Sequence, residues 1–113
     1  MEYTAKVSSV RITPRKMGVL VDEVRGKNIN AALNYLELSR KRRAAFVLKT
    51  LLKSAVANAD NKSKGAVDVD NLVISEILVG KAMTMKRFRP RAKGSAFPIL
   101  KRTSHISVKL VER

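Results

Sequence analysis

Residues 80–103 read GKAMTMKRFRPRAKGSAFPILKRT, and this stretch decides the architecture that we expect. It carries eight Lys and Arg side chains and no Asp or Glu, too much charge for a segment lying against a core. It nevertheless separates two strand-like segments, 67–79 and 106–110. We therefore predict a long antiparallel hairpin that projects from the folded body, with its turn at 91–94 and arms reaching about 35 Å. A basic loop that becomes ordered only on binding is the alternative.

Alternation of apolar and polar residues predicts three strands outside this hairpin. Residues 2–12 form an irregular first strand, because the alternation slips after Val7. Residues 67–79 are rich in the β-branched residues that favour strands. Their apolar side chains divide between two faces, with Val73, Ile77 and Val79 on one and Leu72, Ile74 and Leu78 on the other. A half-buried last strand contains Ile106, Val108 and Leu110.

Two short helices are predicted between the first two strands. The first begins at Thr13-Pro14, where Thr can cap the helix and Pro suits its first position, and it stops at Gly26. Within this first helix, apolar residues follow helical spacing at Met17, Leu20, Val21 and Val24. The second helix runs from about residue 29 to residue 38, with Asn28 as the candidate cap.

A third helix is the clearest element of the sequence. It begins after Ser39 and fades over residues 58–61, ahead of a polar loop at 61–65. Its start coincides with four consecutive cations, Arg40-Lys41-Arg42-Arg43, which the positive end of the helix dipole disfavours. A phosphate bound at the helix start would turn this conflict into a favourable contact. The alternative is that these long side chains simply extend into water.

Together the elements predict an α+β fold, with three helices packed on a small antiparallel sheet and the basic hairpin projecting from it. The chain has 113 residues, so one domain is expected. Its globular body comprises about residues 1–79 and 104–113. The extended arm comprises about residues 80–103 and belongs to the same domain.

The composition indicates a folded protein that works on a polyanion. Lys and Arg number 24 against 9 Asp and Glu, a formal charge of +15, and 45% of the residues are apolar. Such a surface repels itself unless nucleic acid or an anionic membrane neutralises it. The absence of Cys excludes disulfide frameworks, zinc ribbons and thiol catalysis. No segment has the character of a membrane span or a signal peptide, so a cytosolic location is the default.

No residue pattern favours an enzyme. His105 is the only His, without Cys or an acidic cluster nearby, and we interpret it as a structural residue or a phosphate contact. The glycines are isolated and form no phosphate-cradling motif. Phe88 and Phe97 flank the expected turn, where they would either stack on bases or pack across the hairpin. We therefore expect no catalytic residue, no metal and no cofactor.

Several motifs resemble a known family over the whole length of the chain. Those that carry the resemblance are Arg15-Lys16, Ser54 to Ala59, Pro90 to Gly94 and Thr103 to Ile106. The last two together are highly specific. On these residues the chain resembles bacterial large-subunit ribosomal protein twenty-two. It departs from the family at Ser95, where Arg is common, and at Phe97-Pro98, where polar residues are common.

The resemblance implies a structural constituent of the large ribosomal subunit, located in the cytoplasm within the ribosome. It implies binding to several domains of large-subunit ribosomal RNA, a role in assembly, and a hairpin that lines part of the nascent-peptide exit tunnel. Neighbouring ribosomal proteins and the nascent peptide would be further partners. Neither a membrane nor an obligate homo-oligomer is expected.

Carried over by position, the resemblance also implies which residues act. The tip lining the tunnel would comprise Arg89, Pro90, Arg91, Ala92, Lys93 and Gly94. The residues binding RNA would be Arg11, Arg15, Lys16, Arg40, Lys41, Arg42, Arg43, Lys81, Lys86, Arg87, Arg89, Arg91, Lys93, Lys101, Arg102 and His105. Arg and Lys at these positions would neutralise phosphates that converge from separate RNA segments.

An architectural DNA-binding protein with basic hairpin arms is the alternative function. Such arms can insert a Pro into the minor groove, and Pro90 fits that role superficially. Proteins of this kind act as dimers, however, and no helix here has an apolar face to spare for a partner. A membrane-surface protein would need a basic amphipathic helix, whereas the cations of the third helix gather at one end.

Overall fold

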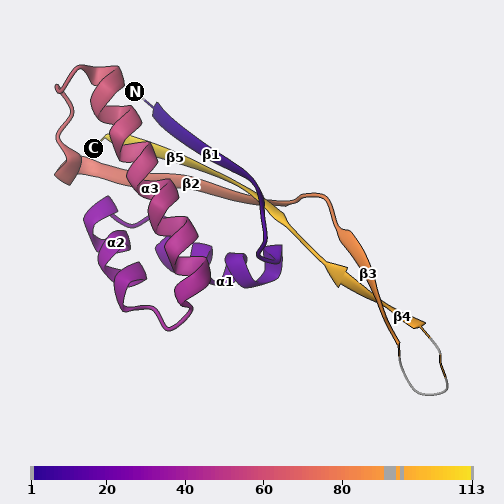
Figure 1. Ribbon diagram of the computed structural model, residues 1–113. Helices are drawn as coiled ribbons and strands as arrows, with labels where there is room; N and C mark the ends of the chain where they lie inside the picture. The colour runs from indigo at the N-terminus through magenta and orange to yellow at the C-terminus, as the bar shows by residue number, and fades with distance from the viewer. Residues whose placement is uncertain (1, 91–93, 95, 113) are drawn as a thin grey trace.

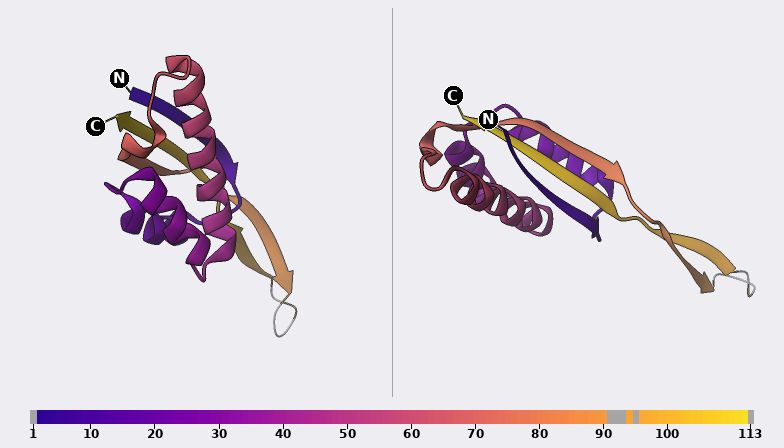
Figure 2. Two further views of the ribbon diagram at one scale, coloured as in Figure 1. Left: turned by 90° about the vertical axis from the view of Figure 1, so that its left-hand side faces the viewer. Right: turned by 90° about the horizontal axis from the view of Figure 1, so that it is seen from above.

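The computed structural model describes residues 2–90, 94 and 96–112, and Figure 1 shows their arrangement. Its elements are β1 (Glu2–Val10), α1 (Pro14–Val24), α2 (Ile29–Leu38), α3 (Arg42–Ser63), a 3-10 turn (Val69–Asn71), β2 (Leu72–Lys81), β3 (Met85–Pro90), β4 (Ala96–Lys101) and β5 (Ser104–Glu112). Strands β1, β5 and β2 form an antiparallel sheet in that order. The helices lie on one face of it (Figure 2), which confirms the predicted α+β class.

The core lies between this sheet and the three helices. On the helices it is built from apolar residues at three- and four-residue spacing, and on β5 from every second residue. Its fully buried members include Met17, Val24, Leu48, Leu52, Ile106, Val108 and Leu110. Burying one Leu or Ile side chain contributes roughly 1.5–3 kcal/mol. This layer therefore holds α1 and α3 in fixed positions relative to the sheet.

The helix starts agree with the predicted caps. The side chain of Thr13 accepts a hydrogen bond from the backbone N–H of Lys16, with Pro14 in the first helical position. The side chain of Asn28 likewise accepts from the N–H of Asn30 at the start of α2. Each bond satisfies one of the amide groups that a helix start leaves without a partner.

Replacing Thr13 by Ala is expected to destabilise the protein by about 1 kcal/mol, because α1 loses its cap. Urea denaturation measures this loss as a lower transition midpoint. Thr50→Ala is the matched control. Thr50 is exposed inside α3, where its hydroxyl only donates back to the carbonyl of Phe46, and Ala favours a helix interior. Equal losses for the two variants would contradict the capping role of Thr13.

Helix α3 is longer than predicted and starts later. It begins at Arg42 and continues to Ser63, through the segment where the sequence indicated fading and into the predicted loop. Ala59 is fully buried in the core, so packing holds the last turns despite their polar residues. The helix ends where Lys64 adopts a left-handed conformation and the N–H of Gly65 donates to the Asp60 carbonyl.

Strand β2 differs from the predicted strand in its first residue and in which of its side chains face the core. The 3-10 turn occupies residues 69–71, so the strand begins at Leu72 rather than at Val67. A β-bulge between Ile74 and Glu76 then inserts one residue into the pairing with β5. Ile77 consequently joins Leu72 and Ile74 on the buried face, and the predicted division of faces was wrong. A strict two-residue alternation contains no signal for a bulge.

The predicted irregularity of the first strand is confirmed. Val7 of β1 pairs with Ile106, whereas Val10 pairs with Ser104, so β1 holds one extra residue against β5. Ser9 takes a left-handed conformation with φ of 55°. Its N–H donates to Nδ1 of His105 at 3.2 Å. The slip in alternation after Val7 thus marks a bulge that His105 stabilises.

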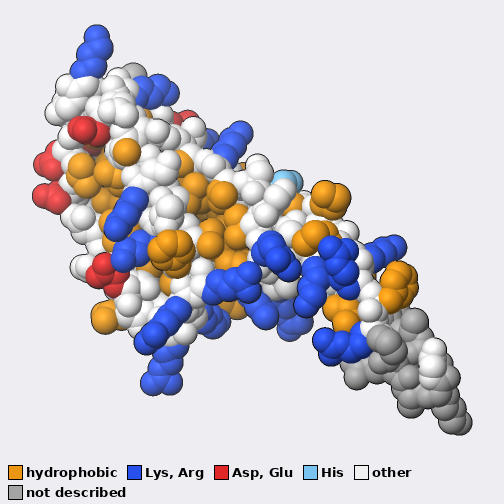
Figure 3. Space-filling model, in the orientation of Figure 1, with side chains coloured by type: hydrophobic (Ala, Val, Ile, Leu, Met, Phe, Trp, Pro, Cys, Tyr) orange, Lys and Arg blue, Asp and Glu red, His pale blue; other side chains and the backbone are white. Residues whose placement is uncertain are grey.

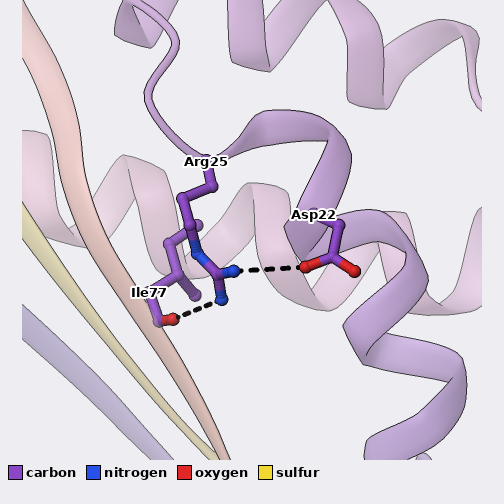
Figure 4. Close-up of polar contacts among 3 residues, drawn as sticks. All are labelled: Asp22, Arg25 and Ile77. Carbon is purple, nitrogen blue, oxygen red and sulfur yellow. Dashed lines mark hydrogen bonds and ion pairs between the residues drawn. The ribbon is translucent and has the colours of Figure 1, made fainter.

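Arg25 joins the end of α1 to the outer edge of β2. Figure 4 shows its guanidinium between two oxygens, donating to Asp22 Oδ1 at 3.2 Å and to the carbonyl of Ile77 at 2.9 Å. The backbone nearby adds hydrogen bonds from Gly26 N–H to the Ile74 carbonyl and from Ile74 N–H to the Lys27 carbonyl. This edge of the sheet is therefore covered by the connection from α1 to α2.

The second sheet extends away from the body. Strands β3 and β4 pair antiparallel from Met85 with Lys101 to Pro90 with Ala96. The protein accordingly measures 65 × 25 × 16 Å along its principal axes, and Figure 1 shows this ribbon leaving the sheet. The predicted turn, Arg91-Ala92-Lys93-Gly94, lies outside the described residues except for Gly94, whose φ is 71°.

Candidate nucleic-acid interface

A groove lined by cations lies where the body meets the second sheet. Its volume is about 890 Å³, and three separate parts of the chain form its walls. Eight cations line it: Arg11, Arg15, Lys16, Lys41, Arg42, Arg43, Lys101 and Arg102. The remaining lining residues are Ile12, Thr13, Val19, Ala44 and Leu100. Figure 3 shows Lys and Arg side chains gathered over the middle of the molecule, next to exposed apolar surface.

Secondary structure accounts for this convergence. Arg11 lies in the bend between β1 and α1, and Arg15 and Lys16 occupy the first turn of α1. The second wall is the start of α3, and the third is the end of β4 with Arg102 after it. Helix starts and a strand end meet here because the core fixes α1 and α3 against the sheet. The groove therefore depends on the tertiary fold.

The start of α3 differs from those of the other helices. Its N-cap is Lys41, whose side chain makes no capping hydrogen bond, and no acidic residue lies in the first turn. The amide groups and the positive end of the dipole thus face a region that already contains Lys41, Arg42 and Arg43. This agrees with the conflict noted in the sequence, and an anion in the groove would relieve it.

None of the eight groove cations forms an ion pair with any acidic residue in the described part of the chain. The four ion pairs found there join Arg25 to Asp22, Lys49 to Glu37, and Lys109 to both Glu2 and Glu76. The hydrogen bond to Lys49 lowers the pKa of Glu37. Interaction with Glu76, then with Glu2, raises the pKa of Lys109. Internal charge compensation thus occurs away from the groove, whose cations are left for an external anion.

Two buried hydroxyls set the junction between the two sheets. Thr103 Oγ1 donates to the carbonyl of Met83 at 2.6 Å, and the N–H of Ala82 donates to the Thr103 carbonyl at 3.0 Å. Ser104 Oγ donates to the carbonyl of Ile12 in the groove wall. Thr103 and Ser104 are the only buried polar residues among those described. Thr103 thus holds the end of β4 to the segment between β2 and β3, and Ser104 holds the start of β5 to the bend that carries Arg11.

Replacing Thr103 by Val, which has the same shape, is expected to cost about 1 kcal/mol, because the Met83 carbonyl loses its donor. Amide exchange of Ala82 should accelerate as the junction loosens, and native-state hydrogen exchange measures this rate. Thr84→Val is the control, since Thr84 is exposed in the same segment. Unchanged Ala82 exchange in Thr103→Val would show that the hydroxyl does not hold the junction.

The other predicted site residues lie outside the groove. Arg40 is exposed and is not among the lining residues, and Lys81 is exposed at the end of β2. Lys86, Arg87 and Arg89 are exposed on β3. Arg91, Ala92 and Lys93 of the predicted tip lie outside the described residues. Three of these candidates therefore lie along β3, whereas Arg40 and Lys81 lie on the body, and together they do not form one compact site.

The structure also indicates the roles of Phe88 and His105. Phe88 is 72% exposed, and its register partner across the ribbon is Pro98, not Phe97. Of the two interpretations offered by the sequence, a free aromatic face agrees better with this exposure. His105 uses Nδ1 to accept from Ser9, so it has a structural role. Its other ring nitrogen carries the proton when the ring is neutral.

Sequence reasoning missed the apolar residues of the groove and its junction. Val19 on α1 and Leu100 on β4 are 48% and 45% exposed and face the groove together. Val19 follows Lys16 by three positions and Arg15 by four, so it lies on the same side of α1. This spacing was available in the sequence. The position of Leu100 beside Val19 in the groove could not be predicted, since the two residues come together only on folding.

The described residues contain no group of three or more His, Cys, Asp or Glu side chains that could hold a metal ion. Within that same part of the chain, no helix combines the length and the apolar character needed to cross a membrane.

A concave cluster of cations without acidic neighbours, next to an exposed basic ribbon, defines a protein of the nucleic-acid-binding class. The comparisons with known proteins specify the class further. Residues 5–111 match the family described as Ribosomal protein L22p/L17e. The chain is 49% identical over 112 residues to large ribosomal subunit protein uL22 of Myxococcus xanthus, covering 99% of this chain and 97% of that protein. It is 51% identical to the protein of that name from Citrifermentans bemidjiense, covering 100% and 99%.

The chain therefore belongs to the ribosomal protein L22p/L17e family. It is a structural constituent of the large ribosomal subunit and not an enzyme, and it is located in the ribosome in the cytoplasm. Membership also supports association with ribosomal RNA and other ribosomal proteins. The alternative of an architectural DNA-binding protein has no support from these relatives.

Proposed function

We propose that the groove between α1, α3 and the end of β4 binds the phosphate backbone of large-subunit ribosomal RNA. One observation carries this proposal: eight cations from three parts of the chain line the groove, and none of them is paired with an acidic residue in the described part of the chain. RNA phosphates that approach one another repel strongly, and a cationic groove between them removes that repulsion. The proposed contribution to assembly is to let separate RNA segments come together.

The groove is suited to position RNA more than to read its sequence. Three of the eight cations, Arg15, Arg42 and Arg43, are Arg side chains at helix starts, where each guanidinium can hold one phosphate by two parallel hydrogen bonds. Lys acts there as a point charge. Phosphate contacts fix orientation and carry little sequence information. The relative arrangement of the walls, set by the core and by the bonds of Thr103 and Ser104 at the junction, then determines which RNA shape fits.

For the second sheet we propose the role implied by the family resemblance, lining part of the nascent-peptide exit tunnel. Its support is the extended shape, with a long axis of 65 Å, and the exposed Lys86, Arg87 and Arg89 on β3. A two-stranded ribbon has little stability in water, so surrounding RNA would supply its packing. In this proposal, residues 1–79 and 104–113 form the body of a single domain, and residues 80–103 form its arm.

Photocrosslinking from intact large subunits tests both roles. A photoreactive residue at Arg89 is expected to crosslink to tunnel-wall RNA and, in stalled ribosomes, to the nascent peptide. The same residue at Arg43 is expected to crosslink to RNA, and at exposed Lys62, near the end of α3, to crosslink to RNA much less. Tunnel lining is wrong if Arg89 reaches only peripheral proteins. RNA binding by the groove is wrong if Arg43 gives no RNA crosslink.

A further inference from the structure

We propose that the groove takes a short unpaired RNA segment, with at least one base lying on its apolar floor, and not the outer surface of an RNA duplex. We call the four apolar lining residues of the groove, Ile12, Val19, Ala44 and Leu100, the apolar floor; Val19 and Leu100 supply most of its exposed surface. The inference rests on the proposed function and narrows it, because phosphate neutralisation alone requires no particular RNA conformation.

The size of the groove is the first argument. Pockets of roughly 300–1,000 Å³ enclose one ligand the size of a drug molecule. The groove, at about 890 Å³, is therefore of the right order to hold one or a few nucleotides. A duplex presents a broad convex surface made by its two backbones. Its bases are paired and stacked beneath that surface. Such a surface can touch the rim of the groove, but it has no part that enters.

The apolar floor is the second argument. Val19 and Leu100 leave almost half of their surface exposed although both lie beside cations. A phosphate gains nothing from an aliphatic surface, whereas the face of an unpaired base does. On α1, Val19 lies one turn beyond Arg15 and Lys16 on the same side, so a base on Val19 places its own phosphate within reach of those cations.

The arrangement of the cations is the third argument. They stand on three walls, at the start of α1, at the start of α3 and at the end of β4. The phosphates of a duplex lie on one convex surface and would meet these walls one at a time. A single strand can bend and present successive phosphates to all three, as in basic grooves that follow single-stranded nucleic acids.

The lining residues also predict that the groove does not distinguish one base from another. Among the described residues that line the groove, Thr13 is the only one whose side chain is polar and uncharged, and its oxygen already accepts a hydrogen bond from the N–H of Lys16. The side chains therefore offer donors and apolar surface but no free set of acceptors for reading a base edge. We expect tolerance of base identity, with packing on the aliphatic side chains weaker than stacking on the aromatic platforms of other single-strand binding proteins.

The experiment compares two RNA duplexes of the same sequence, one fully paired and one carrying a three-nucleotide bulge of uridines. Fluorescence anisotropy with the full chain at 0.15 M salt gives both affinities. We expect the bulged RNA to bind about tenfold more tightly. The variant Val19→Ala/Leu100→Ala should lower this ratio to about two, whereas Leu38→Ala/Leu78→Ala, which truncates exposed apolar residues that are not among the lining residues, should leave it near ten.

Each outcome decides the inference. A ratio near one for the unaltered chain overturns it, while RNA binding that weakens steeply with salt still supports the proposed function. A ratio near ten that Val19→Ala/Leu100→Ala does not change also overturns it, because the unpaired segment would then lie elsewhere. If the affinity for RNA did not change with salt concentration, the proposed function, phosphate binding by the groove, would itself be wrong. A thermal melt checks folding, and Val19→Ala alone replaces the double variant if that variant melts early.

Discussion

Replacing Arg42, Arg43, Lys101 and Arg102 together by Gln is expected to weaken RNA binding about 10³-fold at 0.1 M salt. Each phosphate contact contributes about 0.7–0.9 to the slope of log affinity against log salt. Between 1 M and 0.1 M salt, one contact is thus worth about five- to eightfold in affinity, and four contacts multiply to about 10³. Titrations of a ribosomal RNA fragment over this range should also show a slope smaller by about 3.

A control with the same change in net charge separates the groove from general attraction. Lys6, Lys53, Lys62 and Lys64 are exposed and do not line the groove. Replacing these four by Gln should cost less than about tenfold in affinity, since few of them would lie against phosphate. If the two quadruple variants lose affinity equally, binding depends on overall charge and the groove has no special role.

Replacing Leu52 by Ala is expected to destabilise the protein by about 3–5 kcal/mol, the largest stability effect of any single change considered. Leu52 is fully buried at the centre of α3, and truncating such a residue removes apolar contacts and leaves a cavity. Small domains are stable by only about 5–15 kcal/mol, so the variant should melt far below the unaltered chain. Thermal and urea denaturation measure the loss.

Leu38→Ala is the matched control for this truncation. Leu38 ends α2 and is 86% exposed, so its replacement should change stability by less than about 0.5 kcal/mol. A small loss for Leu52→Ala, similar to that of Leu38→Ala, would mean that the layer between α3 and the sheet does not stabilise the body.

Features encoded by a few neighbouring residues could be predicted from the sequence. Thr13-Pro14 and Asn28 determine their helix starts through bonds to amides two or three residues away. The slip after Val7 likewise has a local cause, the bulge at Ser9. The end of α3 could not be predicted in this way, because polar residues at 58–61 suggest a loop and only burial of Ala59 holds the helix.

The groove shows where sequence reasoning stops. The cations at Arg15, Arg42 and Lys101 were each predicted to bind RNA, but as separate contacts along the chain. Their meeting around Val19 and Leu100 depends on how α1, α3 and the second sheet pack together. Arg25 illustrates the converse. It is a cation in a basic chain, yet it holds α1 to β2 through Asp22 and the Ile77 carbonyl.

The bulges in the two strands that pair with β5 have a consequence for the loss of single residues from the sheet. Both neighbours of β5 hold an extra residue against it, at Ser9 in β1 and between Ile74 and Glu76 in β2, while β5 alternates without interruption. Losing the extra residue from β2 would leave the apolar side chains on either side still facing the helices. Losing one residue from the middle of β5 would reverse the facing along the rest of that strand, turning apolar side chains to water beside both neighbours at once. Loss of the extra residue should therefore be tolerated in each outer strand, whereas loss of one residue from the middle of the central strand should not be.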